Sequence, residues 1–293
     1  MQAPRAQPPD ARLTRRQFLK VSLATVATVG LGTGSYSWLV EPHWLEFVRL
    51  QLPISNLPAA LERARLVQLS DIHIGPFVSD DYVLGTFRRV AELRPDIVVV
   101  TGDFVTYDDD IVAHARRIYA HLPHGRLATI GTLGNHDYGY GPDWSDYAMA
   151  DRLAGALTEQ GVRVLRNEVA RVAGLQVVGM DDLQANRFDP TKAFEGVDMR
   201  QPLLGLSHDP DTVDLPGWGD FDGWTLAGHT HGGQVKPPFL PPPVLPVKNR
   251  RYTSGEFEIS GGRHLYINRG VGHWLPIRFN CRPEVTVFEL RRA

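Results

Sequence analysis

The sequence predicts an α/β fold, a four-layer α-β-β-α sandwich in which two mixed sheets pack together and helices flank them. Two observations lead to this prediction. In the first half of the chain, apolar runs of strand length alternate with helix-like segments, as in βαβ units. Beyond residue 161, strand-like runs follow one another with few helices between them, and two sheets explain this pattern better than a single doubly wound sheet.

The first half contains three predicted strands and three predicted helices. Ser79 is a suitable N-cap, three acidic residues suit the N-terminus of the second helix, and Gly161 ends the third. The strands are residues 66–70, 97–101 and 127–132, and the helices are residues 79–93, 108–122 and 145–160.

Six further strands are predicted in the second half. A proline-dense segment, residues 237–246, interrupts them and predicts an extended, stiff loop, because proline lacks the backbone N–H of a strand or helix. The length of residues 41–293 suits a single catalytic domain. The six strands are residues 175–179, 202–207, 224–227, 257–259, 265–267 and 285–288.

Composition excludes several classes of protein. With 43% hydrophobic and 22% charged residues, the chain of 293 residues is ordinarily globular. A net charge of -2 lacks the basic excess of nucleic-acid-binding proteins, so no nucleic-acid partner is expected. Cys281 is the single cysteine, which excludes intramolecular disulfides, thiolate zinc clusters and protein-held iron-sulfur clusters. Any metal must be held by His, Asp, Glu or Asn.

The first forty residues differ from the rest. Residues 1–20 carry five basic side chains and one acidic one, and residues 21–40 carry no charge, which predicts an export signal or a membrane anchor over residues 1–40. Residues 14–20 (TRRQFLK) resemble a twin-arginine signal, which implies the twin-arginine translocase as a partner and a periplasmic or extracytoplasmic location. The alternative is a weakly hydrophobic helix with two chance arginines. Twenty uncharged residues can span a bilayer and no Ala-x-Ala site is evident, so cleavage and retention in the cytoplasmic membrane both stay open.

Five predicted strands are followed directly by residues that bind hard or borderline metals. The carboxyl ends of neighbouring strands meet at one crevice, so these residues can converge. Each motif alone is weak, but their conjunction predicts a metal site at the carboxyl ends of the strands. The motifs are Asp71-x-His73, Gly102-Asp103, Gly134-Asn135-His136-Asp137, His208 and Gly228-His229-x-His231.

This series resembles the signature of the calcineurin-like metallophosphoesterases. Residues 228–234 (GHTHGGQ) and the tail motifs YINRGVG and PIRF resemble the exported or membrane-associated bacterial branch similar to UDP-2,3-diacylglucosamine pyrophosphohydrolase. The resemblance implies two divalent ions that clamp a phosphate and activate a bridging hydroxide as the nucleophile. Mn, Fe and Zn suit these donors better than Mg or Ca, and ligand type does not choose among the three. The implied ligands are Asp71, His73, Asp103 and His231 for one ion, and Asp103, Asn135, His208 and His229 for the other.

His136 is implied to face the substrate, where an imidazolium stabilises charge on the phosphate or protonates the leaving oxygen. Asp137 is interpreted as a turn or helix-cap residue. Many phosphatases of this family have an Asp three residues after the bridging Asp, paired with the substrate-facing histidine, whereas this chain has Thr106. The acid role of His136 is therefore less well supported than its location.

The proline-dense loop directly after the His-x-His motif is the best indication of the substrate. Its apolar residues (Phe239, Leu240, Val244, Leu245) and the basic Lys248, Arg250 and Arg251 suggest a lip that touches acyl chains or an anionic membrane surface, and the alternative is a buried brace against a strand. Arg269 and Arg278 are candidates for phosphate contact, but we favour solvated or ion-paired surface residues. Asp181 and Asp182 fit a loop feature better than a third metal site. Tyr138, Tyr140 and Trp144 suit either a substrate wall or ordinary packing.

Three functions fit the sequence. The favoured one is a dinuclear phosphoesterase that hydrolyses a phosphodiester or pyrophosphate of lipid or nucleotide-sugar type. The alternatives are a phosphomonoesterase or nucleotidase of the same fold and a non-catalytic exported metal-binding protein.

Overall fold

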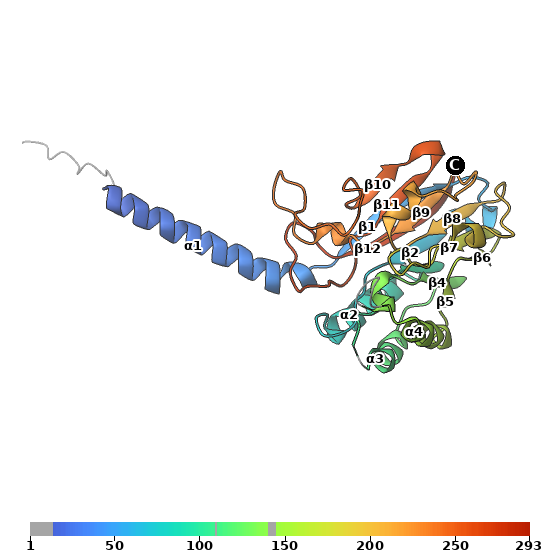
Figure 1. Cartoon of the computed structure of the whole chain (residues 1–293), viewed down its shortest axis with the longest axis horizontal. Helices are drawn as coiled ribbons and strands as arrows, with labels where there is room; N and C mark the ends of the chain where they lie inside the picture. The colour runs from blue at the N-terminus through green and yellow to red at the C-terminus, as the bar shows by residue number, and fades with distance from the viewer. Residues whose placement is uncertain (1–13, 109, 140–144) are drawn as a thin grey trace, which may run out of the picture.

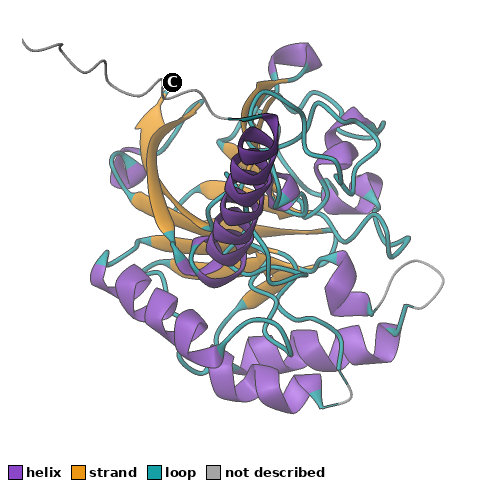
Figure 2. Cartoon of the chain, turned by 90° about the vertical axis from the view of Figure 1, so that its left-hand side faces the viewer, coloured by secondary structure: helices purple, strands orange, loops and turns teal. Residues whose placement is uncertain are grey.

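The computed structural model describes residues 14–108, 110–139 and 145–293 (Figure 1). Two six-stranded mixed sheets pack face to face, which confirms the predicted sandwich. Long helices cover the outer face of one sheet, at the bottom of Figure 2. The outer face of the other sheet carries a thinner layer of 3-10 helices, loops and the short helix α5 (Pro190–Ala193).

The first sheet has the strand order β1-β12-β2-β3-β4-β5. The strands β2 to β5 run parallel, whereas β12 is antiparallel to β2 and parallel to β1. Three amphipathic helices bury one face against this sheet, with Phe87 and Leu153 packed in one core with Val98. The elements are β1 (Glu46–Ile54), β2 (Arg65–Leu69), α2 (Asp80–Glu92), β3 (Ile97–Thr101), α3 (Ile111–Tyr119), β4 (Ala128–Thr132), α4 (Tyr147–Glu159), β5 (Arg163–Leu165) and β12 (Glu284–Arg292).

The second sheet has the order β10-β11-β9-β8-β7-β6, with antiparallel pairs only at its two edges. A dry core between the sheets joins Leu66 and Val99 of the first sheet to Val177, Leu204 and Leu226 of the second. The strands are β6 (Glu168–Val172), β7 (Leu175–Gly179), β8 (Leu203–Leu206), β9 (Trp224–Ala227), β10 (Gly255–Glu258) and β11 (His264–Ile267).

Three strands, β1, β5 and β6, were not predicted from the sequence. β1 and β6 are edge strands, so one side of each pairs with no strand and their side chains are largely half-buried or exposed. β1 also contains Pro53, which argues against a strand except at an edge. β5 has only three residues, too few for an alternating pattern to stand out.

Helix α1 (Arg15–Leu39) projects from the sandwich (Figure 1). Its N-cap is Thr14, whose side chain accepts the N–H of Gln17 in a capping box. Within α1 only Ser37 is buried, and the segment 15–43 is long and apolar enough to cross a membrane by length and composition. The helix forms where the sequence predicted an export signal or a membrane anchor.

Candidate metal centre

The predicted ligands lie in loops at the carboxyl ends of five strands, three from the first sheet and two from the second. β2, β3 and β4 lead into the loops of Asp71, Asp103 and Asn135, and β8 and β9 lead into those of His208 and His229. The site therefore sits where the ends of both sheets meet. Five of the seven predicted ligands have a left-handed backbone, which costs energy for residues other than glycine and is typical of functional sites. Their φ angles are 48° at Asp71, 52° at His73, 51° at Asp103, 70° at His229 and 50° at His231.

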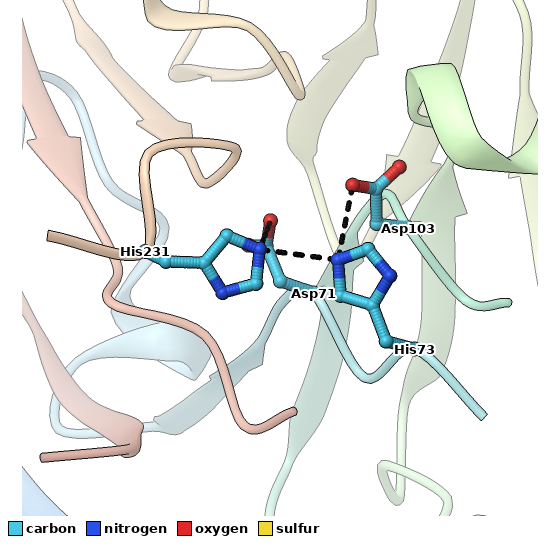
Figure 3. Close-up of side chains that lie close together, drawn as sticks. All are labelled: Asp71, His73, Asp103 and His231. Carbon is cyan, nitrogen blue, oxygen red and sulfur yellow. Dashed lines mark hydrogen bonds and ion pairs between the residues drawn. The ribbon is translucent and has the colours of Figure 1, made fainter. Parts of the chain in front are cut away.

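The first group of donors is Asp71, His73, Asp103 and His231, all buried (Figure 3). Figure 3 shows the four side chains pointing toward one another from three loops. His231 Nε2 lies 3.3 Å from Asp71 Oδ1, and His73 Nε2 lies 3.3 Å from Asp103 Oδ2. The two Nε2 atoms are 3.1 Å apart.

The second group is Asp103, His208 and His229, with Asn135 beside it. His208 Nε2 lies 3.2 Å from Asp103 Oδ2, 3.2 Å from Asn135 Oδ1 and 3.1 Å from His229 Nδ1. Asp103 Oδ2 thus faces both groups, through His73 on one side and His208 on the other. All seven predicted ligands are brought together, with Asp103 between the two groups.

The electrostatics of this cluster fit a bound cation. Burial, together with the nearby negative charge of Asp103, raises the pKa of Asp71 to about 7. Burial also lowers the pKa values of His73 and His231 well below their ordinary values. Asp71 and Asp103, which repel each other, and His73 and His231, which resist protonation, leave a buried set of oxygen and nitrogen donors. A divalent ion neutralises such a set without a proton on each donor.

Hydrogen bonds to the far side of two imidazoles orient their other nitrogen into the cluster. His208 Nδ1 donates to the carbonyl of Thr101 over 2.8 Å, so Nε2 is left to face the site. His73 Nδ1 lies 3.0 Å from the hydroxyl of Thr106, which leaves Nε2 facing the site in the same way. Outer partners of this kind fix the tautomer of metal-binding histidines.

The family of the protein follows from comparison with known proteins. The calcineurin-like phosphoesterase family matches residues 64–243, which include every one of these donors. The chain belongs to the calcineurin-like phosphoesterase family. It is therefore a metal-dependent phosphoric ester hydrolase, and the buried cluster is where this phosphoesterase could hold metal.

Three relatives match this phosphoesterase over nearly its whole length. The phosphodiesterase YaeI of Escherichia coli is 33% identical, covering 95% of this chain and 99% of that protein. The uncharacterized metallophosphoesterase YkuE of Bacillus subtilis is 31% identical, covering 96% and 98%. The UDP-2,3-diacylglucosamine pyrophosphatase LpxG of Chlamydia trachomatis is 28% identical, covering 92% and 97%.

His136 lies beside the buried cluster of candidate metal donors. Its ring makes an edge contact with the ring of His73, and its backbone N–H donates to Asp103 Oδ1 over 2.9 Å. Its Nδ1 is buried and has no hydrogen-bond partner among the described residues. Thr106, at the position where the family resemblance implies an Asp, contacts His73 instead, so its hydroxyl orients a candidate ligand.

Asp137 is a turn cap, as expected from the sequence. Its two carboxylate oxygens accept the backbone N–H groups of Val105, over 3.0 Å, and Gly134, over 2.9 Å. These bonds tie the loop that follows Asp103 to the loop that carries Asn135.

A pocket of about 240 Å³ opens over the donors. Gln184 and Trp274 line it, and neither was expected from the sequence because no motif marks them. The proline-dense loop contributes Val244 and Pro246 to the wall, which places the loop at the site. The other lining residues are Asp103, Asn135, His136, His229 and His231.

The remaining sequence candidates have structural roles. Arg269 is ion-paired with Glu284 and Glu46, in agreement with the plainer interpretation. Arg278 is not on the surface: its guanidinium is fully buried and donates to the carbonyls of Arg269, Gly272 and Cys281. The sequence gives no sign that this arginine is buried. Its partners are backbone carbonyls, which every residue has, so no acidic side chain marks the site.

Tyr138 and the Asp181-Asp182 pair belong to the scaffold. The hydroxyl of Tyr138 donates to Asp181, and Asp182 accepts the backbone N–H of Ala185 over 2.7 Å. Tyr138 is buried and packs as an ordinary aromatic. Tyr140 and Trp144 lie outside the described residues.

Proposed function

We propose that the protein is a dinuclear phosphoesterase that hydrolyses a phosphodiester or a pyrophosphate of lipid or nucleotide-sugar type. The position of Asp103 Oδ2 carries this proposal, because one carboxylate oxygen lies within 3.3 Å of a histidine from each donor group. A shared carboxylate holds two ions close together despite their repulsion. The activities in the names of YaeI and LpxG support the two substrate classes.

The proposed ligands are those expected from the sequence, with Asp71, His73, Asp103 and His231 for one ion and Asp103, Asn135, His208 and His229 for the other. When bound, Mn, Fe or Zn ions supply Lewis acidity that activates water and neutralises charge on the phosphate. The protein's own share of the chemistry lies in His136, which lines the pocket next to the donors. We assign to its imidazole the donation of a proton to the leaving-group oxygen.

The N-terminal segment supports a membrane-bound, extracytoplasmic location. We assign residues 1–40 to an anchor or twin-arginine signal and residues 41–293 to one catalytic domain. The described part of the helix begins with Arg15, Arg16 and Lys20 and then carries no charge up to its end. Basic residues before a spanning helix stay on the cytoplasmic side, which puts the catalytic domain on the other side.

Metal analysis and ester hydrolysis test the proposal together. The purified full chain is loaded with Mn, its metal content is measured, and it is assayed on bis(p-nitrophenyl) phosphate, on p-nitrophenyl phosphate and on UDP-2,3-diacylglucosamine. Two ions per chain with hydrolysis of the diester or the pyrophosphate support the proposal. One ion per chain contradicts the dinuclear site. Hydrolysis of the monoester alone contradicts the substrate class and favours a phosphomonoesterase.

A further inference from the structure

The end of α1 is fixed to the catalytic domain rather than tethered by a loose linker. The carbonyl of Ser37 accepts the backbone N–H of Arg278 over 2.9 Å, and the buried carboxylate of Glu41 accepts the N–H of Cys281. Both bonds reach the irregular segment 270–283, which also borders the metal site, since Cys281 Sγ donates to the carbonyl of His231. The direction of α1 is therefore set relative to the site.

Exposed apolar side chains gather around this attachment point. Outside residues 15–43, the described residues include nine large hydrophobic side chains that are exposed, and six of them come from three segments near the end of α1. We call these six the apolar rim. They are Trp44, Phe239, Leu240, Val244, Trp274 and Leu275.

Hydrogen bonds join two segments of the apolar rim to each other and fix the third, Trp44, to Arg282. The side chain of Gln234, just before the proline-dense loop, binds the backbone of Trp274 and Leu275 over 3.1 Å each. The guanidinium of Arg282 donates to the carbonyl of Trp44 over 3.0 Å and stacks on its ring. Figure 2 looks toward the domain along α1 and shows loops surrounding the base of the helix.

The mouth of the pocket lies within the apolar rim. Val244 and Trp274 line the pocket over the metal donors, yet they are 59% and 40% exposed. Phe239 is fully exposed and Leu240 is 63% exposed on the same loop. The lip expected from the sequence is thus open to solvent at these positions, whereas Leu245 is buried and braces the loop. A cluster of exposed apolar side chains beside a pocket is typical of an interaction site.

We propose that the apolar rim inserts into the surface of the bilayer that α1 spans, so that the pocket takes its phosphoester from the headgroup layer. α1 supports the bilayer as the occupant, because its 25 residues, about 37 Å at about 1.5 Å each, can cross a hydrocarbon core of about 30 Å. The helix leaves the domain beside the rim, which keeps the rim near that surface. Exposed Lys236 and Arg250 on the neighbouring loop suit anionic headgroups. The choice of substrate rests on the proposed function, but the membrane contact does not.

Fluorescence quenching by lipid tests the membrane contact directly. The full chain carrying Leu240→Cys is labelled with an environment-sensitive dye and reconstituted in phosphatidylethanolamine and phosphatidylglycerol vesicles with brominated acyl chains. Cys281 is buried, so the introduced thiol is the accessible one. The matched control is Leu127→Cys, an exposed position just before β4, at the end of that strand away from the metal donors. Strong quenching at 240 and weak quenching at 127 support the proposal. Equal quenching at both positions overturns it. A change in dye fluorescence at 240 that follows the protein concentration and not the lipid also overturns it, because it indicates contact between protein molecules.

Activity on two substrates tests the delivery of lipid. We expect Phe239→Ser with Leu240→Ser to lower hydrolysis of a lipid-linked phosphodiester in vesicles by at least about tenfold and to leave bis(p-nitrophenyl) phosphate nearly unaffected. Leu127→Ser is the control and should change neither rate. Equal losses on both substrates overturn the proposal. If the unsubstituted chain cleaves neither, the proposed function fails, and the quenching experiment still decides the membrane contact.

Discussion

Replacing Gly228 by Ala should disable the metal centre through a single added methyl group. The Cβ of an alanine at 228 would lie 1.9 Å from Ser70 Oγ and 2.3 Å from Asp71 Oδ2. Atoms in real structures essentially never approach a Cβ closer than 3.0 Å, so the Asp71 oxygen must move by at least about 0.7 Å. Metal sites hold their ligands within about 0.2 Å of fixed distances.

Neither clashing neighbour can move freely. Ser70 Oγ donates to the carbonyl of Thr101 over 3.0 Å and accepts the hydroxyl of Thr101 over 2.8 Å. Asp71 accepts the backbone N–H of His229 at 2.9 Å and 3.1 Å. Losing two or three such bonds costs about 1 kcal/mol each, so we expect a loss of about 2 to 3 kcal/mol in the free energy of unfolding. The affinity for Mn should fall on the order of 10²-fold.

Gly155→Ala is the matched control for this prediction. Gly155 lies inside α4, and an added Cβ there meets nothing within 4 Å, so the substitution should stabilise by about 0.5 to 1 kcal/mol. The assays are chemical unfolding of the metal-free protein and a Mn titration against a competing chelator. The reasoning is wrong if Gly228→Ala has the same free energy of unfolding and the same affinity for Mn as the unsubstituted chain.

Three further predictions concern the site and its surroundings. Asp103→Asn should nearly abolish ester hydrolysis and lower the metal content measured by elemental analysis, because Asp103 Oδ2 faces both donor groups; full metal content with normal turnover contradicts this. His136→Ala should keep the metal and lower kcat on the order of 10²-fold, and an unchanged kcat would remove the acid role. Burial lowers the pKa of His273 from about 6.5 in the unfolded chain to about 4 in the folded protein. As the pH falls from about 6.5 toward 4, the unfolded chain gains a proton that the folded protein does not, so the folded state loses stability over this range. The difference in unfolding free energy between the unsubstituted chain and His273→Gln should therefore change by about 2 kcal/mol between pH 7 and pH 5, and parallel pH curves would refute it.

The ligand loops could be predicted from the sequence for a simple reason. Each follows a fully or largely buried apolar strand, and such a run ending in Asp, Asn or His is visible without knowledge of the fold. The edge strands gave no such signal. β1 (Glu46–Ile54) is half exposed, and it pairs with β12 (Glu284–Arg292), which comes near the other end of the sequence. The pairing of β1 with β12 beside β2 depends on long-range contacts that no local sequence pattern contains.

The sequence by itself determined the fold class, the donor types and the presence of an apolar N-terminal helix, because strand patterns and donor chemistry are properties of short segments. Only the tertiary structure decided that Asp103 Oδ2 lies between the two donor groups, that Thr106 orients His73, and that Arg278 is buried against backbone carbonyls. It also decided that the end of α1 and the proline-dense loop lie beside one pocket. Those facts depend on distances between segments far apart in the chain, which are set by how the two sheets pack.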